Sequence, residues 1–136
     1  MQRILSQSLK RRGTKIKRET NIALKRLTSF KLNGAVRQLI VIESDDDLKN
    51  LPKNGIAVGG GSNLIVDPEI KQPLIKVSPN YKSFQIENGM LVCSAGATVS
   101  KILRWMTMNN VSGLEFAAGV PATIGGMVYM NFECWG

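Results

Sequence analysis

The sequence predicts a single α+β domain built from two small lobes, the first partly parallel and the second more antiparallel. Three observations lead to this fold class. Short apolar runs alternate with one helical pattern in the first part of the chain. An Asn-Gly dipeptide then separates two strand-like segments, and an amphipathic helical pattern follows it. A length of 136 residues fits one domain.

The first lobe is predicted to contain short strands and one capped helix. Residues 36–42 are rich in branched apolar side chains and predict a strand. Ser44 is a suitable N-cap, and the acidic residues 45–47 suit the positive end of a helix dipole. We expect this helix to reach about Leu51 and to end at Pro52. Three further segments are predicted to be extended: residues 56–58, 64–66 and 74–77.

The second lobe is predicted to begin with a hairpin. Residues 84–87 and 90–94 are the strands, and Asn88-Gly89 is the favoured two-residue turn, because both positions accept positive φ. Thr98 then precedes a helix that should stop near residues 109–110. Four apolar residues at i, i+3, i+4 and i+7 spacing form its buried face: Val99, Ile102, Leu103 and Met106.

The positive charge of the chain lies almost entirely in its first 26 residues. The whole chain has a net charge of +8. Residues 1–26 contain nine basic residues and one acid, which gives +8, and the other 110 residues contain nine of each. We therefore expect residues 1–26 to be a solvated basic arm and the domain to occupy residues 27–136. Nucleic-acid binding by the arm is the less favoured alternative.

Composition excludes several kinds of site. The sequence has no histidine, which removes the commonest general base and most zinc sites. Its two cysteines, Cys93 and Cys134, make neither a disulfide framework nor a metal site, so a reducing cytoplasm is the expected location. No apolar run has the length of a membrane span. The chemistry must therefore come from backbone groups, hydroxyls, charges or a cofactor.

Two glycine-rich segments are candidates for phosphate binding. Residues 59–63 read Gly-Gly-Gly-Ser-Asn directly after a short strand, and successive N–H groups there can point into one concavity. Residues 119–126 read Gly-Val-Pro-Ala-Thr-Ile-Gly-Gly, and Pro121 suits the first position of a helix whose free N–H groups near residues 123–125 could meet an anion. In both segments, a tight turn or close packing is the alternative interpretation. Two common phosphate motifs do not fit the first segment: the dinucleotide fingerprint requires glycine where Leu64 stands, and the Walker A loop requires a lysine.

Taken together and in order, these segments resemble the FAD-binding part of the UDP-N-acetylenolpyruvoylglucosamine reductase family. The resemblance extends over about residues 24–136. It rests on the entry motif Leu-Thr-Ser-Phe-Lys-Leu-Asn-Gly-Ala and on the loop Gly-Gly-Gly-Ser-Asn-Leu-Ile-Val. A small-residue stretch, Ser-Ala-Gly-Ala, and the glycine-rich segment that runs on to Asn131 complete it. These four motifs lie at residues 27–35, 59–66, 94–97 and 119–131.

The resemblance implies a vanillyl-alcohol-oxidase or PCMH-type fold, with FAD held between two α+β lobes. It implies that NADPH reduces a UDP-sugar substrate through that FAD in peptidoglycan synthesis. The residues that it assigns to cofactor binding are Gly59, Gly60, Gly61, Ser62, Asn63, Leu64, Gly119, Pro121, Thr123, Gly125 and Gly126.

The resemblance assigns no catalytic or metal-binding residue to this chain, because the family's catalytic residues follow its last matching motif. Phe132 and Glu133 are bulkier than the family pattern near the expected flavin. A substrate domain, on the same or a separate chain, would complete the enzyme. We expect these 136 residues alone to be inactive, and a stand-alone flavin-binding module or an interaction protein is the alternative.

Overall fold

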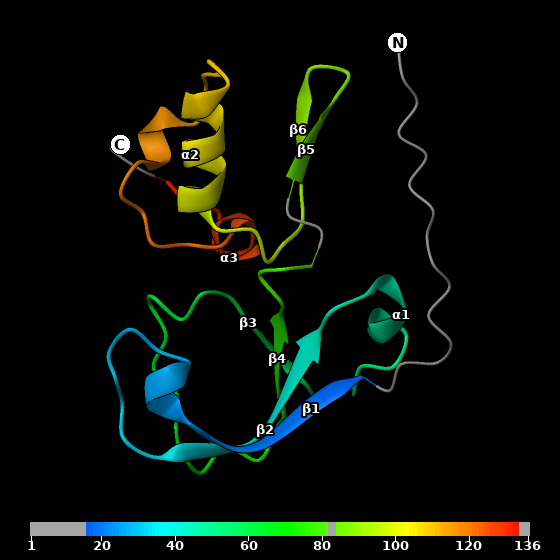
Figure 1. Ribbon diagram of the computed structural model, residues 1–136. Coiled ribbons are helices and arrows are strands. Elements are labelled where there is room, and N and C mark those ends of the chain that lie inside the picture. The colour runs from blue at the N-terminus through cyan, green and yellow to red at the C-terminus, as the bar shows by residue number, and fades with distance from the viewer. Residues whose placement is uncertain (1–15, 82–83, 134–136) are drawn as a thin grey trace.

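The computed structural model describes residues 16–81 and 84–133 and contains two lobes, one above the other in Figure 1. The first lobe is a four-stranded sheet with one short helix beside it. The second lobe holds a two-stranded hairpin and the longer helices. The α+β class and the two-lobe organisation are therefore confirmed.

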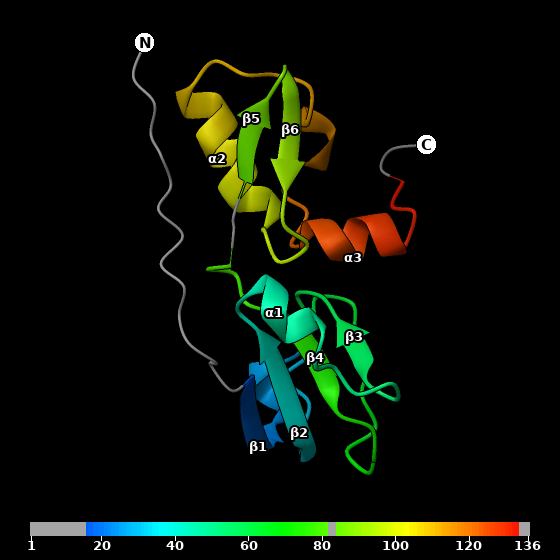
Figure 2. The ribbon, with the colours of Figure 1, turned by 90° about the vertical axis from the view of Figure 1, so that its right-hand side faces the viewer.

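The first sheet has the strand order β1-β2-β4-β3. β1 (Lys17–Ala23) is antiparallel to β2 (Ala35–Ile42), whereas β2 and β3 (Ile56–Val58) both run parallel to β4 (Leu74–Val77). The three parallel strands therefore end at the same edge of the sheet, the edge that faces the second lobe in Figure 2. Ligands of open sheets of this kind bind beyond the carboxyl ends of the strands.

The predicted domain boundary near Leu27 is wrong. β1 begins at Lys17, and a 3-10 turn, η1 (Leu24–Arg26), follows it. Ile22 and Leu24 are buried in the same core cluster as Leu27. The strand escaped prediction because it is an edge strand, whose exposed positions are polar and charged and whose pairing depends on β2.

The first helix, α1 (Asp45–Leu48), is shorter than predicted but is capped as the sequence indicates. The Ser44 hydroxyl accepts a hydrogen bond from the Asp47 N–H at 3.3 Å. The Asp47 carboxylate accepts in return from the N–H groups of Glu43 and Ser44, at 2.8 and 2.9 Å. This capping box satisfies backbone donors at the end of β2 and so fixes the direction in which the chain leaves the sheet.

The second lobe matches the predicted hairpin and helix closely. β5 (Phe84–Glu87) pairs with β6 (Met90–Cys93), and both turn residues, Asn88 and Gly89, have positive φ. The helix α2 (Val99–Met108) follows, and it buries three of the four predicted residues while Leu103 is half-buried. Phe84 packs edge-on against Trp105, with ring centroids 5.4 Å apart.

Two short helices complete the second lobe: η2 (Glu115–Ala117) and α3 (Ile124–Tyr129). α3 lies between the rest of the second lobe and the first lobe (Figure 2). Within the described ranges, no helix is long and apolar enough to cross a membrane. Residues 64–66 form no strand, but Val66 is buried in the core of the first lobe.

Candidate functional site

The glycine loop, residues 59–64, leaves the carboxyl end of β3 at the edge of the sheet that faces the second lobe. Within residues 16–81 and 84–133, none of its six backbone N–H groups donates a hydrogen bond. The loop also contains no charged side chain. Consecutive N–H groups without partners are a potential site for an anion, because each is a strong donor that needs an acceptor.

Gly61 attaches this loop to the entry segment of the first lobe. Its carbonyl accepts a hydrogen bond from the Ser29 N–H at 2.9 Å. Its φ is +79°, and a Cβ at this position would lie 1.8 Å from the carbonyl oxygen of Leu27. Only glycine therefore fits here, and its main role is to let the loop lie against the backbone of residues 27–28.

The second glycine-rich segment lies directly against the first. A Cβ at Gly59 would be 3.0 Å from the Thr123 hydroxyl and 3.5 Å from the Gly126 Cα. A Cβ at Gly60 would be 3.7 Å from the Thr123 methyl group and 3.9 Å from the carbonyl oxygen of Pro121. The structure therefore brings together the two glycine-rich segments, which are about sixty residues apart in sequence.

The predicted helix start at Pro121 is wrong, because α3 begins at Ile124 and Thr123 is its N-cap. The Thr123 hydroxyl accepts a hydrogen bond from the Gly126 N–H at 3.4 Å. The N–H groups of Ile124 and Gly125 donate to the carbonyls of Ala97 and Ala95, both at 2.9 Å. Those two donors are therefore not available to a ligand.

The Thr123 N–H is the exception near this helix start, since it donates no hydrogen bond within the described residues. It lies 3.9 Å from the position of a Gly60 Cβ and so adjoins the glycine loop. Within the second lobe, Thr123 also forms an isolated β-bridge with Thr98. The sequence could not reveal the contact between Thr123 and Gly60, because it joins two segments that are distant in the chain.

The other residues that the sequence assigned to cofactor binding differ in their surroundings. Gly125 packs against Ala95, since a Cβ there would be 2.8 Å from the Ala95 Cβ. Gly119 is exposed with a φ of +81°, and no atom outside its neighbours lies within 4 Å of its Cβ position. Leu64 packs against the core of the first lobe. Ser62 is half-buried and Asn63 is exposed, so both can still meet a ligand.

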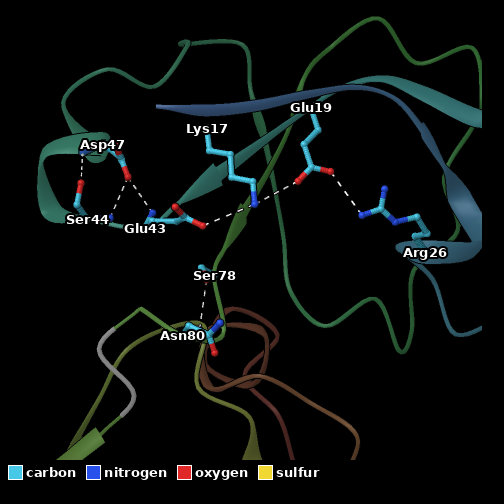
Figure 3. A network of polar contacts seen from close by, with 8 residues as sticks. All are labelled: Lys17, Glu19, Arg26, Glu43, Ser44, Asp47, Ser78 and Asn80. Atoms are coloured by element: carbon cyan, nitrogen blue, oxygen red, sulfur yellow. Dashed lines mark hydrogen bonds and ion pairs between the residues drawn. The ribbon is translucent and has the colours of Figure 1, made fainter. Parts of the chain in front are cut away.

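A charged cluster on the first sheet was not predicted (Figure 3). Lys17 pairs with Glu19 at 3.5 Å and with Glu43 at 3.8 Å, and Arg26 pairs with Glu19 at 3.5 Å. Lys76 on β4 lines a cavity together with these four residues, and burial lowers the pKa of its ammonium group. The signal in the sequence was a single lysine within an otherwise apolar strand, Leu-Ile-Lys-Val.

Glu115, Glu133 and the Cys93 thiol lie outside this charged cluster. Glu115 is exposed, and backbone N–H groups, its own first and then that of Gly113, lower the pKa of its carboxyl. Glu133 is exposed. Burial raises the pKa of the Cys93 thiol, which favours its unreactive form. Cys134 lies outside the described residues.

Known proteins resemble the chain in both sequence and fold. The family model described as FAD binding domain matches residues 48–136. The UDP-N-acetylenolpyruvoylglucosamine reductases of Treponema denticola and Clostridium tetani are 34% and 35% identical to it. Each match covers 82% or 83% of this chain. The chain spans about two-fifths of each of those relatives, 38% and 39%.

A solved structure supports the same relationship. The crystal structure of UDP-N-acetylenolpyruvylglucosamine reductase from Thermus caldophilus matches with a TM-score of 0.72 and 25% sequence identity. The match covers 87% of this chain and 42% of that one. The fold of this chain is therefore shared with part of that reductase.

Proposed function

This chain belongs to the FAD binding domain family, and on that basis we propose that its glycine loop and Thr123 hold the pyrophosphate of FAD. The observation that supports this proposal is the row of backbone N–H groups at residues 59–64, which have no partner within the described residues. Pro121 and Gly126 also lie close to the loop, since the Pro121 carbonyl oxygen is 3.9 Å from a Gly60 Cβ position and the Gly126 Cα is 3.5 Å from a Gly59 Cβ position. A pyrophosphate offers several anionic acceptors, and short glycines allow it to approach the backbone closely.

The residues present suit this cofactor. Gly59 and Gly60 leave the space beside Thr123 free of side chains, and an added Cβ at either position would enter that space. Gly61 is held in place by the first lobe, so the loop is ordered before a ligand arrives. Such preorganisation reduces the entropy lost on binding.

We propose further that the chain is the cofactor-binding part of a cytoplasmic UDP-N-acetylenolpyruvoylglucosamine reductase that uses NADPH. FAD would supply the hydride-transfer chemistry, and the residues of this chain would bind it and orient it. The chain covers about two-fifths of its relatives, so the UDP-sugar would be bound mainly by sequence outside these 136 residues. We favour this function over a stand-alone flavin module, since both relatives described above are named as reductases.

Flavin titration tests the cofactor proposal. We expect the purified chain to quench the fluorescence of FAD on binding, and to bind FAD at least about tenfold more tightly than riboflavin, which lacks phosphates. Protein that takes up no added FAD would contradict the proposal. Equal affinity for FAD and riboflavin would show that the loop does not bind the pyrophosphate.

The chain alone is expected to bind FAD without catalysing the full reaction. The reason is that the chain spans only 38% and 39% of the Treponema denticola and Clostridium tetani reductases, so we expect the groups that complete the reaction to lie in sequence outside these 136 residues. The measurement is NADPH oxidation in the presence of UDP-N-acetylenolpyruvoylglucosamine, with the Treponema denticola relative as the positive control. Turnover by the chain at the rate of that relative would show that the additional sequence is dispensable.

A further inference from the structure

Strand pairing places Lys76 in a row of paired residues that crosses the first sheet, one from each strand, and ends next to the glycine loop. Lys17 pairs with Val41, Val41 with Lys76, and Lys76 with Val58. Directly paired residues point to the same face of a sheet, so these side chains share one face. Gly59 follows Val58 directly, so the loop starts where this row ends.

A cavity of about 260 Å³ lies on this face, and its lining reaches the carboxyl end of β4. Leu39 and Val41 form an apolar part of its lining, and Ser78 and Asn80 contribute polar atoms at the carboxyl end of β4. Leu27 also lines it, and the carbonyl of Leu27 is the group that lies against Gly61. Leu27 therefore adjoins both the cavity and the glycine loop.

The charges around this cavity leave one cation available. Its charged lining residues are Lys17, Glu19, Arg26, Glu43 and Lys76. Both glutamates already pair with Lys17 or Arg26 (Figure 3). Lys76 pairs with no carboxylate anywhere in the described ranges, although its residue is half-buried.

An unpaired, half-buried ammonium group costs stability in the ligand-free protein. Burial lowers the pKa of Lys76, which is the expected consequence of that cost. The glycine loop lacks a cation, because it offers an anion only backbone N–H groups and carries no charged side chain. A ligand phosphate between Lys76 and the glycine loop would satisfy both groups.

We propose that Lys76 supplies the positive charge for a phosphate group bound on the glycine loop, with the cavity beside it admitting that phosphate. The proposal rests on the function proposed above, in which the phosphate belongs to FAD. It adds a side-chain cation to a site whose other donors are backbone N–H groups, and it gives the lone polar residue of β4 a role in ligand binding.

The test compares FAD affinity in Lys76→Met, Lys76→Arg and Lys53→Met. Lys53 is exposed and precedes the amino end of β3, so its replacement removes the same charge at the opposite edge of the sheet. We expect Lys76→Met to weaken FAD binding about 10- to 100-fold, the range for loss of a charge-assisted hydrogen bond. Lys76→Arg should recover most of that loss, and Lys53→Met should leave the affinity unchanged.

Thermal denaturation without FAD separates ligand binding from a structural role. If Lys76 serves the ligand, Lys76→Met should unfold at the wild-type temperature or above it, because the variant no longer buries an unpaired charge. A lower unfolding temperature would instead assign Lys76 a structural role and overturn the proposal. Wild-type affinity in Lys76→Met would also overturn it, whereas failure of the wild-type chain to bind FAD would refute the proposed function itself.

Discussion

Replacing Gly61 with alanine is expected to destabilise the folded chain by about 3 kcal/mol or more, which is a large part of the stability of a domain this size. Two costs combine. The positive φ of +79° costs an alanine roughly 1–2 kcal/mol. The new methyl group would also lie 1.8 Å from the Leu27 carbonyl oxygen, so backbone must move and the hydrogen bond from Ser29 is strained. Urea denaturation of the FAD-free protein, followed by circular dichroism, measures the loss.

Gly89→Ala is the matched control for this experiment. Gly89 has nearly the same φ, +76°, but no atom outside its neighbours lies within 4 Å of its Cβ position. It should therefore show the backbone cost of about 1–2 kcal/mol without the steric cost. Equal denaturation midpoints for the two variants would show that contact with Leu27 does not hold the glycine loop in place.

Gly60→Asp is expected to weaken FAD binding by at least about 100-fold while leaving the protein folded. The φ of Gly60 lies outside the left-handed region, and its Cβ position has only ordinary contacts, the nearest at 3.7 Å. A side chain there is tolerated sterically, but a carboxylate would face the bound pyrophosphate. Two like charges about 4 Å apart repel by roughly 4 kcal/mol at an effective dielectric constant near 20. Fluorescence titration with FAD measures the loss, and circular dichroism confirms folding.

Two further substitutions separate charge from bulk at Gly60. Gly60→Asn has the shape of Gly60→Asp without its charge, and Gly60→Ala adds the methyl group alone. We expect FAD affinity to decrease in the order alanine, asparagine, aspartate, with the largest step at aspartate. Affinity within about threefold of wild type in Gly60→Asp would contradict the assignment of the loop to the pyrophosphate.

Local sequence signals predicted the elements that depend on neighbouring residues. The Asn88-Gly89 turn and the buried face of α2 were predicted correctly, because turn conformation and helical periodicity are local properties. The N-cap at Ser44 was also predicted correctly, since an N-cap and the N–H group that it accepts from lie within one helical turn. The predicted helix start at Pro121 was wrong. The helix begins at Ile124, where the N–H groups of Ile124 and Gly125 donate to the carbonyls of Ala97 and Ala95, which belong to a distant loop.

The sequence by itself determined that this chain has two lobes and two glycine-rich segments suited to close approach of a backbone. Only the tertiary structure decided that these segments meet, with Gly59 and Gly60 facing Thr123, while Gly125 serves packing. It also decided that β1 belongs to the domain and that Lys76 stands beside the glycine loop. The physical reason is that strand pairing and contacts between lobes join residues far apart in the chain, and no local periodicity encodes which strand a polar segment will pair with.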